Sequence, residues 1–238
     1  MNGVDKYSFA DVDNVSETIP INTTINKKSV KTVIEKGIKR CVDIIAGIVG
    51  VLILIPLTLI IYIIRKIKKE DDGPIFYEQI RIGKNGKKFR IYKFRSMVIG
   101  ADEILKKYLE ENEEARIEFE AKQKLENDPR ITKLGKFLRK TSLDEFPQFL
   151  NVLKGDMSLI GPRPLIIGEL DSHNGNHEKY EKMRPGITGW WACNGRSDLE
   201  YDERLELEYY YTENFSIALD IKVFVKTIVQ VIKREGAV

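Results

Sequence analysis

Two adjacent carboxylates, Asp144 and Glu145, are the residues whose types and spacing most directly suggest chemistry. They lie just before Pro147, and a helix tolerates proline only in its first turn. We therefore expect a helix that begins near Asp144, with both carboxylates at the positive end of its dipole. An ionised aspartate can attack phosphorus, and a neighbouring carboxylate can hold Mg²⁺ against a diphosphate. Ser142 and Glu145 also have capping-box spacing, so an ordinary helix start is the alternative.

Basic residues beside prolines, in turns or at a strand end suggest that the substrate is an anion. A proline restrains the backbone around it, so a neighbouring arginine loses less conformational freedom when it binds a phosphate oxygen. A single arginine of this kind most often lies in an ordinary surface turn. Several of them beside a carboxylate pair and an apolar segment suggest an anionic, membrane-borne substrate. The candidates are Lys93, Arg95, Arg130, Arg139, Arg163 and Arg184.

The overall composition excludes several other classes of protein. The chain has 238 residues, with 39 Lys and Arg against 36 Asp and Glu, so its net charge of +3 is too small to suggest nucleic-acid binding. Hydrophobic residues make up 42% and charged residues 32%, which is typical of a folded chain. The two cysteines, Cys41 and Cys193, exclude a disulfide scaffold and a four-cysteine zinc site, and suggest a reducing compartment.

An uncharged apolar run over residues 44–64 indicates a membrane segment. A straight helix of this length would be about 31 Å long, which matches the hydrocarbon core of a bilayer. Pro56 lies inside the run, and both flanks are rich in Lys and Arg, which prefer the cytoplasmic side. A helix broken at Pro56 would keep both flanks on that side. A kinked spanning helix is an equally good interpretation of these residues alone.

The remaining patterns predict a fold of the α+β class that is mainly helical. Asn85 and Gly86 form a strong turn signal, because both accept positive φ, and they predict a β-hairpin over residues 74–97. Helices are expected over 101–127, over 134–153 with an interruption near Pro147, and over 217–232. The last of these helices is expected to lie either at the membrane surface or packed on the soluble core.

These segments, in this order, resemble the bacterial sugar transferase family, the monotopic phosphoglycosyl transferases, from about Lys36 to the C-terminus. The many ordered matches carry the resemblance, and no single motif does. They are Lys39-Arg40 with Asp43; Gly73-Pro74-Ile75-Phe76; Tyr92-Lys93-Phe94-Arg95-Ser96-Met97; Asp128-Pro129-Arg130; Ser142-Leu143-Asp144-Glu145; Asn151-Val152-Leu153-Lys154-Gly155-Asp156; Gly161-Pro162-Arg163-Pro164; and Arg184-Pro185-Gly186.

The resemblance implies a reaction and roles for individual residues. A sugar-1-phosphate passes from a UDP-sugar to undecaprenyl phosphate, and UMP is released. By likeness, Asp144 is the nucleophile that forms a covalent phosphosugar intermediate, and Glu145 helps to hold Mg²⁺. Four further residues match positions associated with the active site, namely Lys93, Arg139, Arg163 and Asp220.

The resemblance also implies an organisation in three parts. Residues 1–32 are expected to be a mobile tail, 33–70 a re-entrant membrane anchor of the helix-break-helix type, and 71–238 a small cytosolic catalytic domain with a β-hairpin and interfacial helices. The expected location is the cytoplasmic face of the bacterial membrane, at the inner leaflet, and a homodimer is left open. The family often has Ser before the membrane proline, where this chain has Ile55. We expect the minimal catalytic form, because the large N-terminal region of some relatives is lacking.

The donor sugar is less closely indicated than the reaction. A long charged insert between Met97 and Asp128, the segment Gly195-Arg196-Ser197-Asp198 and the following Tyr201-Asp202 resemble the branch that uses galactose or glucose. Transfer of an N-acetylhexosamine phosphate is the alternative within the family. A catalytically silent membrane adaptor that recruits partners for glycan assembly is the alternative of another class. The expected pathways are capsule, exopolysaccharide or O-antigen synthesis.

Overall fold

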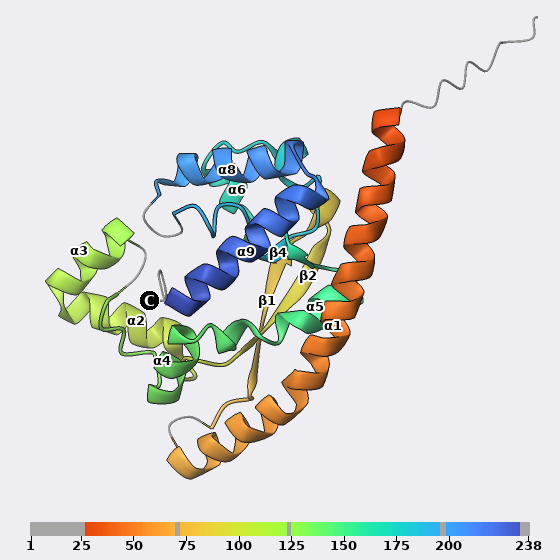
Figure 1. Ribbon diagram of the computed structural model, residues 1–238. Coiled ribbons are helices and arrows are strands. Elements are labelled where there is room, and N and C mark those ends of the chain that lie inside the picture. The colour runs from red at the N-terminus through yellow and green to blue at the C-terminus, as the bar shows by residue number, and fades with distance from the viewer. Residues whose placement is uncertain (1–26, 70–71, 123–124, 196–198, 234–238) are drawn as a thin grey trace, which may run out of the picture.

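The computed structural model describes residues 27–69, 72–122, 125–195 and 199–233. Figure 1 shows a long helix along one side of the molecule, with a mainly helical domain packed against it. The expected tail over residues 1–32 falls almost wholly outside the described residues. The elements are α1 (Lys27–Lys68), β1 (Phe76–Ile82), η1 (Lys84–Gly86), β2 (Lys88–Phe94), α2 (Ala101–Glu111), α3 (Glu113–Lys122), α4 (Lys133–Lys140), η2 (Leu143–Glu145), α5 (Gln148–Lys154), β3 (Ser158–Ile160), α6 (Glu169–Ser172), α7 (His177–Tyr180), β4 (Gly186–Thr188), α8 (Tyr201–Glu213) and α9 (Ile217–Lys233).

The predicted hairpin is confirmed. β1 and β2 pair antiparallel, with Phe76 opposite Phe94 at the open end and Ile82 opposite Lys88 at the turn. The turn η1 places Asn85 at a φ of 56°, and Gly86 at a φ of 72°. Both residues thus adopt the left-handed conformation that their types favour. Among the described residues, the second sheet is a short parallel pair of β3 and β4, which the sequence patterns did not indicate.

Helix α1 is continuous through Pro56, so the expected break is not present in this structure. Pro56 has no N–H to donate to the carbonyl of Leu52, and a helix accommodates such a loss by bending. Figure 1 shows that α1 does bend toward its C-terminal end. The segment 30–68 is long enough and apolar enough to cross a bilayer, with a mean hydropathy of 3.0 in its most apolar stretch, of which only 22% is buried. Its path through a membrane stays a prediction.

One face of α1 is buried against the domain. The buried positions Lys39, Asp43, Gly47, Gly50, Leu54 and Ile61 recur at helical spacing. Leu54 and Ile61 form a core cluster with residues of β2 and α4, and Leu143 and Phe146 pack against it. The carboxylate turn is therefore attached to α1 by the two apolar residues that flank Asp144 and Glu145.

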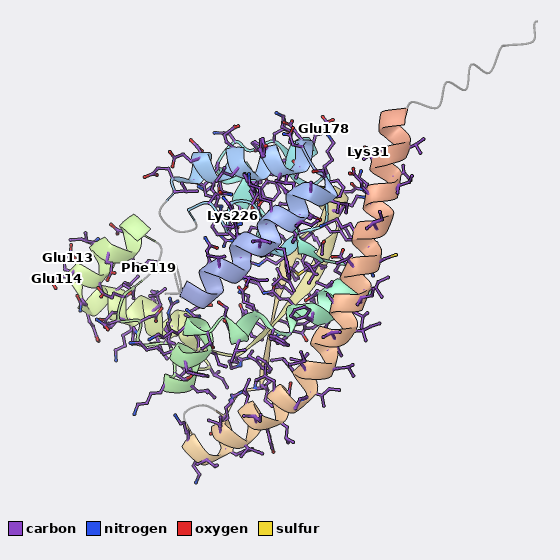
Figure 2. All side chains as sticks on the ribbon, in the orientation of Figure 1. Lys31, Glu113, Glu114, Phe119, Glu178 and Lys226 are labelled. Carbon is purple, nitrogen blue, oxygen red and sulfur yellow. The ribbon has the colours of Figure 1, made fainter. Side chains whose placement is uncertain are left out.

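The charged insert forms two helices rather than the single helix expected over 101–127. Asn112 lies between α2 and α3 in an extended conformation, with a φ of −135°. Its side-chain oxygen accepts a hydrogen bond from the N–H of Ala115 and so caps the start of α3, which a continuous helix would not need. Figure 2 shows Glu113 and Glu114 at the outer edge of α3, and both are exposed.

Helix α9 is confirmed, and one of its faces packs on the domain. Val223 is fully buried, in a cluster with Tyr211 of α8. Thr227 reaches β4, where its Oγ1 lies 3.0 Å from Oγ1 of Thr188. The opposite face of α9 is exposed and apolar, and it carries Ile221, Phe224, Val225, Ile228 and Val229.

The contact between α1 and α5 makes the first testable prediction. A Cβ on Gly50 would lie 2.2 Å from the ring of Phe149, whereas a Cβ on Gly37 would meet nothing within 4 Å. Gly50→Ala should therefore lower the free energy of unfolding by about 1–3 kcal/mol through overpacking. Gly37→Ala, in the same helix, should leave it unchanged or raise it by up to about 1 kcal/mol.

Urea unfolding in mild detergent, followed by circular dichroism, measures both variants. Equal effects of the two substitutions would contradict the close packing of α1 on α5.

Candidate active site

The carboxylate pair lies in a single 3₁₀ turn, η2, and not in the first turn of an α-helix as expected. Ser142 adopts a left-handed conformation, with a φ of 55°, and its side chain makes no capping hydrogen bond, so the capping-box alternative is wrong. The α-helix α5 begins only at Gln148, with Pro147 as its N-cap. Pro147 has no N–H for the carbonyl of Leu143, and the N–H of Phe146 donates to that carbonyl instead.

Helix α5 fixes the turn against the hairpin. Asn151 is fully buried, and its amide group bridges to the edge of β2. Its Nδ2 donates to the carbonyl of Arg90 at 2.6 Å, and its Oδ1 accepts from the N–H of Tyr92 at 3.1 Å. These two bonds place the C-terminal end of β2 beside η2, which brings Lys93 to the carboxylates.

Lys93 and Glu145 form the most direct polar contact in the site. Nζ of Lys93 donates to Oε1 of Glu145 at 2.7 Å, and both side chains are partly exposed. The pKa of Asp144 is raised above its ordinary value, first by burial and then by the charge of Glu145, while Lys93 and Arg139 oppose the rise. Asp144 is therefore a desolvated carboxylate beside two cations.

Arg139 approaches the site from the last turn of α4. Its Nε donates to Oγ of Ser96 at 2.9 Å. Burial lowers the pKa of Arg139, and the charges of Asp144 and Asp128 counteract that effect. Arg130 is held by Asp128 in a bidentate pair, with contacts of 2.8 and 2.7 Å. The positive charge of its guanidinium is therefore already paired with a carboxylate.

Arg163 makes its direct contacts away from the carboxylates, and its link to them is electrostatic, through Arg81. Burial and the charge of Arg163 lower the pKa of Arg81, and Glu145 is among the groups that raise it. Arg81 also donates to the carbonyl of Pro164 at 3.2 Å, which fixes the loop that carries Arg163. The guanidinium of Arg163 lies 5.9 Å from the ring centre of Trp191.

Three predicted site residues make their contacts away from the carboxylates. Arg95 donates to the carbonyl of Pro74 at 2.9 Å. Arg184 donates to the carbonyl of Gly155 at 2.7 Å, beyond the other end of α5. Asp220 accepts from Nζ of Lys39 at 2.6 Å and from the hydroxyl of Tyr211 at 2.6 Å. The structure thus brings Lys93, Arg139 and, through Arg81, Arg163 to the carboxylates, and it does not bring these three.

Asp220 belongs to a buried network that joins the two ends of the described chain. Nζ of Lys39 also donates to the carbonyl of Ile160 at 2.8 Å. Four residues along α1, Asp43 accepts from Oγ of Ser158 and from the N–H of Leu159, both at 2.9 Å. Two charged residues of α1 therefore bind the domain instead of facing lipid.

Arg81, Ser96 and Lys39 were not among the predicted site residues. A signal for Lys39 was present, since it precedes Asp43 by four residues and both lie on the inward face of a helix that is otherwise apolar. Ser96 belongs to one of the matched motifs and Arg81 lies between two of them, but nothing in their spacing shows that they contact an arginine or its loop. Of the donor segment, residues 196–198 lie outside the described residues, and Tyr201 stacks on His173 with ring centres 3.5 Å apart.

The carboxylate oxygens of Asp144 and Glu145 could serve as ligands for one Mg²⁺ ion. Glu145 has one oxygen bound to Lys93, and Asp144 is adjacent to it. Mg²⁺ usually takes one or two protein carboxylates and completes its shell with water and phosphate oxygens, so two carboxylates are sufficient. Within the described residues there is no group of three or more His, Cys, Asp or Glu side chains placed to hold a metal alone.

The raised pKa of Asp144 can be tested directly. Lys93→Gln removes a cation that lowers this pKa, so the pKa should rise further. Carboxyl ¹³C NMR titration measures it, with Asp144→Asn identifying the resonance. Lys133→Gln, an exposed change in α4, serves as the control. A pKa of Asp144 that falls or stays constant in Lys93→Gln would contradict the assigned electrostatics.

The stability effect of Asp144 has a defined sign. Because its pKa is higher in the folded than in the unfolded state, protonation favours the folded state. This contribution is present at low pH and is lost as the pH rises through the raised pKa.

The Lys39–Asp220 pair makes a third prediction. Lys39→Met leaves Asp220 buried without its cation and should lower the free energy of unfolding by about 3–5 kcal/mol. The double variant Lys39→Met/Asp220→Leu should recover much of that loss, because no uncompensated charge remains. Lys107→Met breaks an exposed pair with Glu111 and should cost less than about 0.5 kcal/mol.

Denaturant titration in detergent measures the free energy of unfolding of the three variants. If Lys39→Met had no larger effect than Lys107→Met, the buried pair would not be holding α1 to the domain.

Comparison with known proteins identifies the same family as the motifs in the sequence. A family model described as bacterial sugar transferase matches residues 34–234. The undecaprenyl-phosphate galactose phosphotransferase of Salmonella typhimurium is 46% identical over 200 residues, which are 84% of this chain and 41% of that protein. The exopolysaccharide production protein ExoY of Rhizobium meliloti is 41% identical over 84% of this chain and 87% of its own length.

A third relative has a different sugar in its name. The UDP-N-acetylgalactosamine-undecaprenyl-phosphate N-acetylgalactosaminephosphotransferase of Aeromonas hydrophila is 38% identical over 206 residues, which are 84% of this chain and 45% of that protein. The chain spans about two fifths of the length of the Salmonella protein. Since the family model covers most of the sequence, including every candidate site residue, the chain belongs to the bacterial sugar transferase family.

Proposed function

We propose that this protein transfers a hexose-1-phosphate from a UDP-sugar to undecaprenyl phosphate, with release of UMP, through an intermediate on Asp144. The observation that carries the proposal is the position of Asp144, a partly buried carboxylate flanked by Glu145 and by the cations Lys93 and Arg139. The relatives that act on undecaprenyl phosphate support the acceptor. The reaction would begin the synthesis of a surface polysaccharide, such as a capsule, exopolysaccharide or O-antigen.

The first step is attack by a carboxylate oxygen of Asp144 on the phosphorus attached to the sugar. A bond forms between that oxygen and phosphorus, and the bond from phosphorus to the bridging oxygen breaks. The bridging oxygen and its electron pair leave with UMP. Lys93 and Arg139 stabilise the negative charge that builds on the phosphoryl oxygens, and Arg163 would add a longer-range positive charge.

The second step takes place at the same phosphorus atom, with Asp144 now as the leaving group. A phosphate oxygen of undecaprenyl phosphate attacks, and the bond from phosphorus to Asp144 breaks. The carboxylate is regenerated, and the product is an undecaprenyl diphosphate sugar. Because donor and acceptor use one site in turn, UMP must leave before the acceptor phosphate enters.

Mg²⁺ would be held by Glu145, and when bound it would supply positive charge to the diphosphate oxygens. The protein's own contribution is separate from that charge. Lys93 keeps Glu145 oriented beside Asp144 through its 2.7 Å hydrogen bond. Ser96 orients the guanidinium of Arg139 in the same way.

The acceptor requires the site to lie at a membrane surface, and α1 is suited to hold it there. Leu143 and Phe146, on either side of the carboxylates, pack against the α1 cluster. The opposite face of α1 is apolar and exposed. We infer that the bend of the continuous helix α1 lets it enter and leave the cytoplasmic leaflet on the same side, because its two flanks are both basic. The exposed apolar face of α9 would rest at the same interface.

The sugar remains the least supported part of the proposal. Galactose or glucose is favoured by the donor segment and by the name of the Salmonella relative. An N-acetylhexosamine is the alternative, and the name of the Aeromonas relative supports it. A silent adaptor is disfavoured because the carboxylates, Lys93 and Arg139 are all in place around one site.

The covalent intermediate gives the decisive test. Wild-type protein incubated with Mg²⁺ and UDP-galactose or UDP-glucose should gain the mass of a hexose phosphate and release UMP. Asp144→Asn should lose the adduct and reduce UMP release by at least about 10³-fold, because the nucleophile is gone. Intact-mass spectrometry and nucleotide chromatography measure the two products.

Asp102→Asn, an exposed change in α2, is the matched control and should retain full activity. An adduct with an acetylhexosamine would favour the alternative donor. No adduct and no UMP with any donor would favour the adaptor. Normal turnover by Asp144→Asn would overturn the assignment of the nucleophile.

A further inference from the structure

A second basic pocket lies at the turn of the β-hairpin, outside the candidate active site. It is a cavity of about 220 Å³ between η1, the C-terminal end of α5 and the residue before Pro185. Its wall carries three cations, Lys84, Lys87 and Arg184, and one carboxylate, Asp156. Phe89, which is buried in the core below, lines the cavity as well.

The geometry of β2 separates this pocket from Asp144. The strand begins at Lys88, next to the pocket, and Lys93 near its other end binds Glu145. Five residues of extended strand span about 17 Å. A single phosphate group cannot contact both ends of the hairpin, so the two basic regions are separate sites.

The positive charge in the pocket exceeds its negative charge. Asp156 lies 4.0 Å from Nζ of Lys87, at the outer limit of an ion pair. Glu181 is another carboxylate near the turn, and its Oε1 lies 2.7 Å from Nδ1 of His177. The pKa of Lys84 is lowered by partial burial and by the charges of Arg184 and Lys36, which is the effect of cations that lack a counter-ion.

The arginine in the pocket has its planar end available. Nε of Arg184 donates to the carbonyl of Gly155, and no hydrogen bond of its two terminal nitrogens to the described residues is recorded. That fork matches two oxygens of a phosphate. Gly155 has a φ of 87°, and a Cβ there would lie 3.2 Å from Nη2 of Arg40, so the glycine allows Arg40 to lie close to this wall.

We propose that this pocket binds a phosphate group through Arg184, Lys84 and Lys87, at a site separate from the carboxylate pair. The favoured source of that phosphate is the headgroup of an acidic phospholipid. The charge of Lys36 in α1 acts on Lys84, and the guanidinium of Arg40 lies close to Gly155 in the pocket wall. Arg40 is only four residues, or about 6 Å of helix, before the uncharged run begins at residue 44. A headgroup at the start of that run would therefore be within reach. A soluble phosphate compound is the other source of the same chemistry.

Lysine acylation of the full chain in nanodiscs tests the proposal. The rate at Lys84 and Lys87 is measured by peptide mass spectrometry in phosphatidylcholine discs, in discs that also contain phosphatidylglycerol, and in phosphatidylcholine discs with inorganic pyrophosphate. Binding at twice the dissociation constant slows labelling about threefold by mass action. Slowing with phosphatidylglycerol alone identifies the lipid, and slowing with pyrophosphate identifies a soluble source.

Two variants show whether the effect belongs to the pocket. Lys84→Gln should abolish the slowing at Lys87, and Arg184→Gln should do the same. Lys88→Gln removes an equal charge from the neighbouring strand position, which does not line the cavity, and should leave the slowing intact. Lys84→Gln changes an exposed side chain, so it keeps the test valid even if Arg184→Gln unfolds.

Equal slowing at Lys107, on the distant α2, would indicate diffuse attraction and would overturn the proposal. The absence of slowing under both conditions would overturn it as well. Labelling of Lys93 in the same digests reports occupancy of the active site. Since no sugar donor is added, the outcome is independent of the reaction proposed for Asp144.

Discussion

The buried ion pair between Lys39 and Asp220 is the interaction on which the arrangement of the whole molecule depends. It connects α1 to α9 across 181 positions of sequence, with a distance of 2.6 Å between Nζ and Oδ2. Two charges taken out of water are costly unless their remaining hydrogen bonds are satisfied. The hydroxyl of Tyr211 and the carbonyl of Ile160 meet that requirement, so the pair holds only when α1, α8, α9 and β3 are all in place.

This network determines where the chemistry occurs relative to α1. Asp43 and Arg40 bind β3 and the end of α5, and the small residues Gly47 and Gly50 allow α5 to approach closely. The turn η2 immediately precedes α5 and packs its apolar residues on the same helix. Asp144 is consequently held at a fixed position along the apolar helix α1. The proposed reaction with a lipid-linked phosphate would require such a fixed position.

The hairpin distributes positive charge to two places. Its C-terminal end presents Lys93 to Glu145, where the charge would act on the phosphate that reacts in the proposed transfer. Its turn presents Lys84 and Lys87 toward Arg184, where the charge would act on a phosphate that does not react. The pairing of β1 and β2 keeps the two regions apart. Arg184 lies beside the turn, at the end of the hairpin away from the carboxylates, whereas Arg139 lies near Asp144.

Much of the site could be predicted from the sequence, but its connections could not. The family and the carboxylate pair follow from the ordered motifs, although the pair lies in a 3₁₀ turn and not at the expected helix start. The hairpin with its Asn-Gly turn, helix α9 and the apolar run follow from local patterns, because the residue types in each segment favour one conformation. Helix α1 continues through Pro56 instead of breaking there, and residues on both sides of Pro56, Leu54 and Ile61, pack on the domain. The split between α2 and α3 depends on one capping bond from Asn112.

Asp220 shows the limit of sequence reasoning most clearly. Its residue type and motif position agree with a substrate role, yet its carboxylate is bound to a lysine near the other end of the chain. The sequence by itself determined which groups are present and which local turns carry them. Only the tertiary structure decided which charges neutralise one another, because pairing between distant residues depends on how helices and strands pack and not on their spacing along the chain.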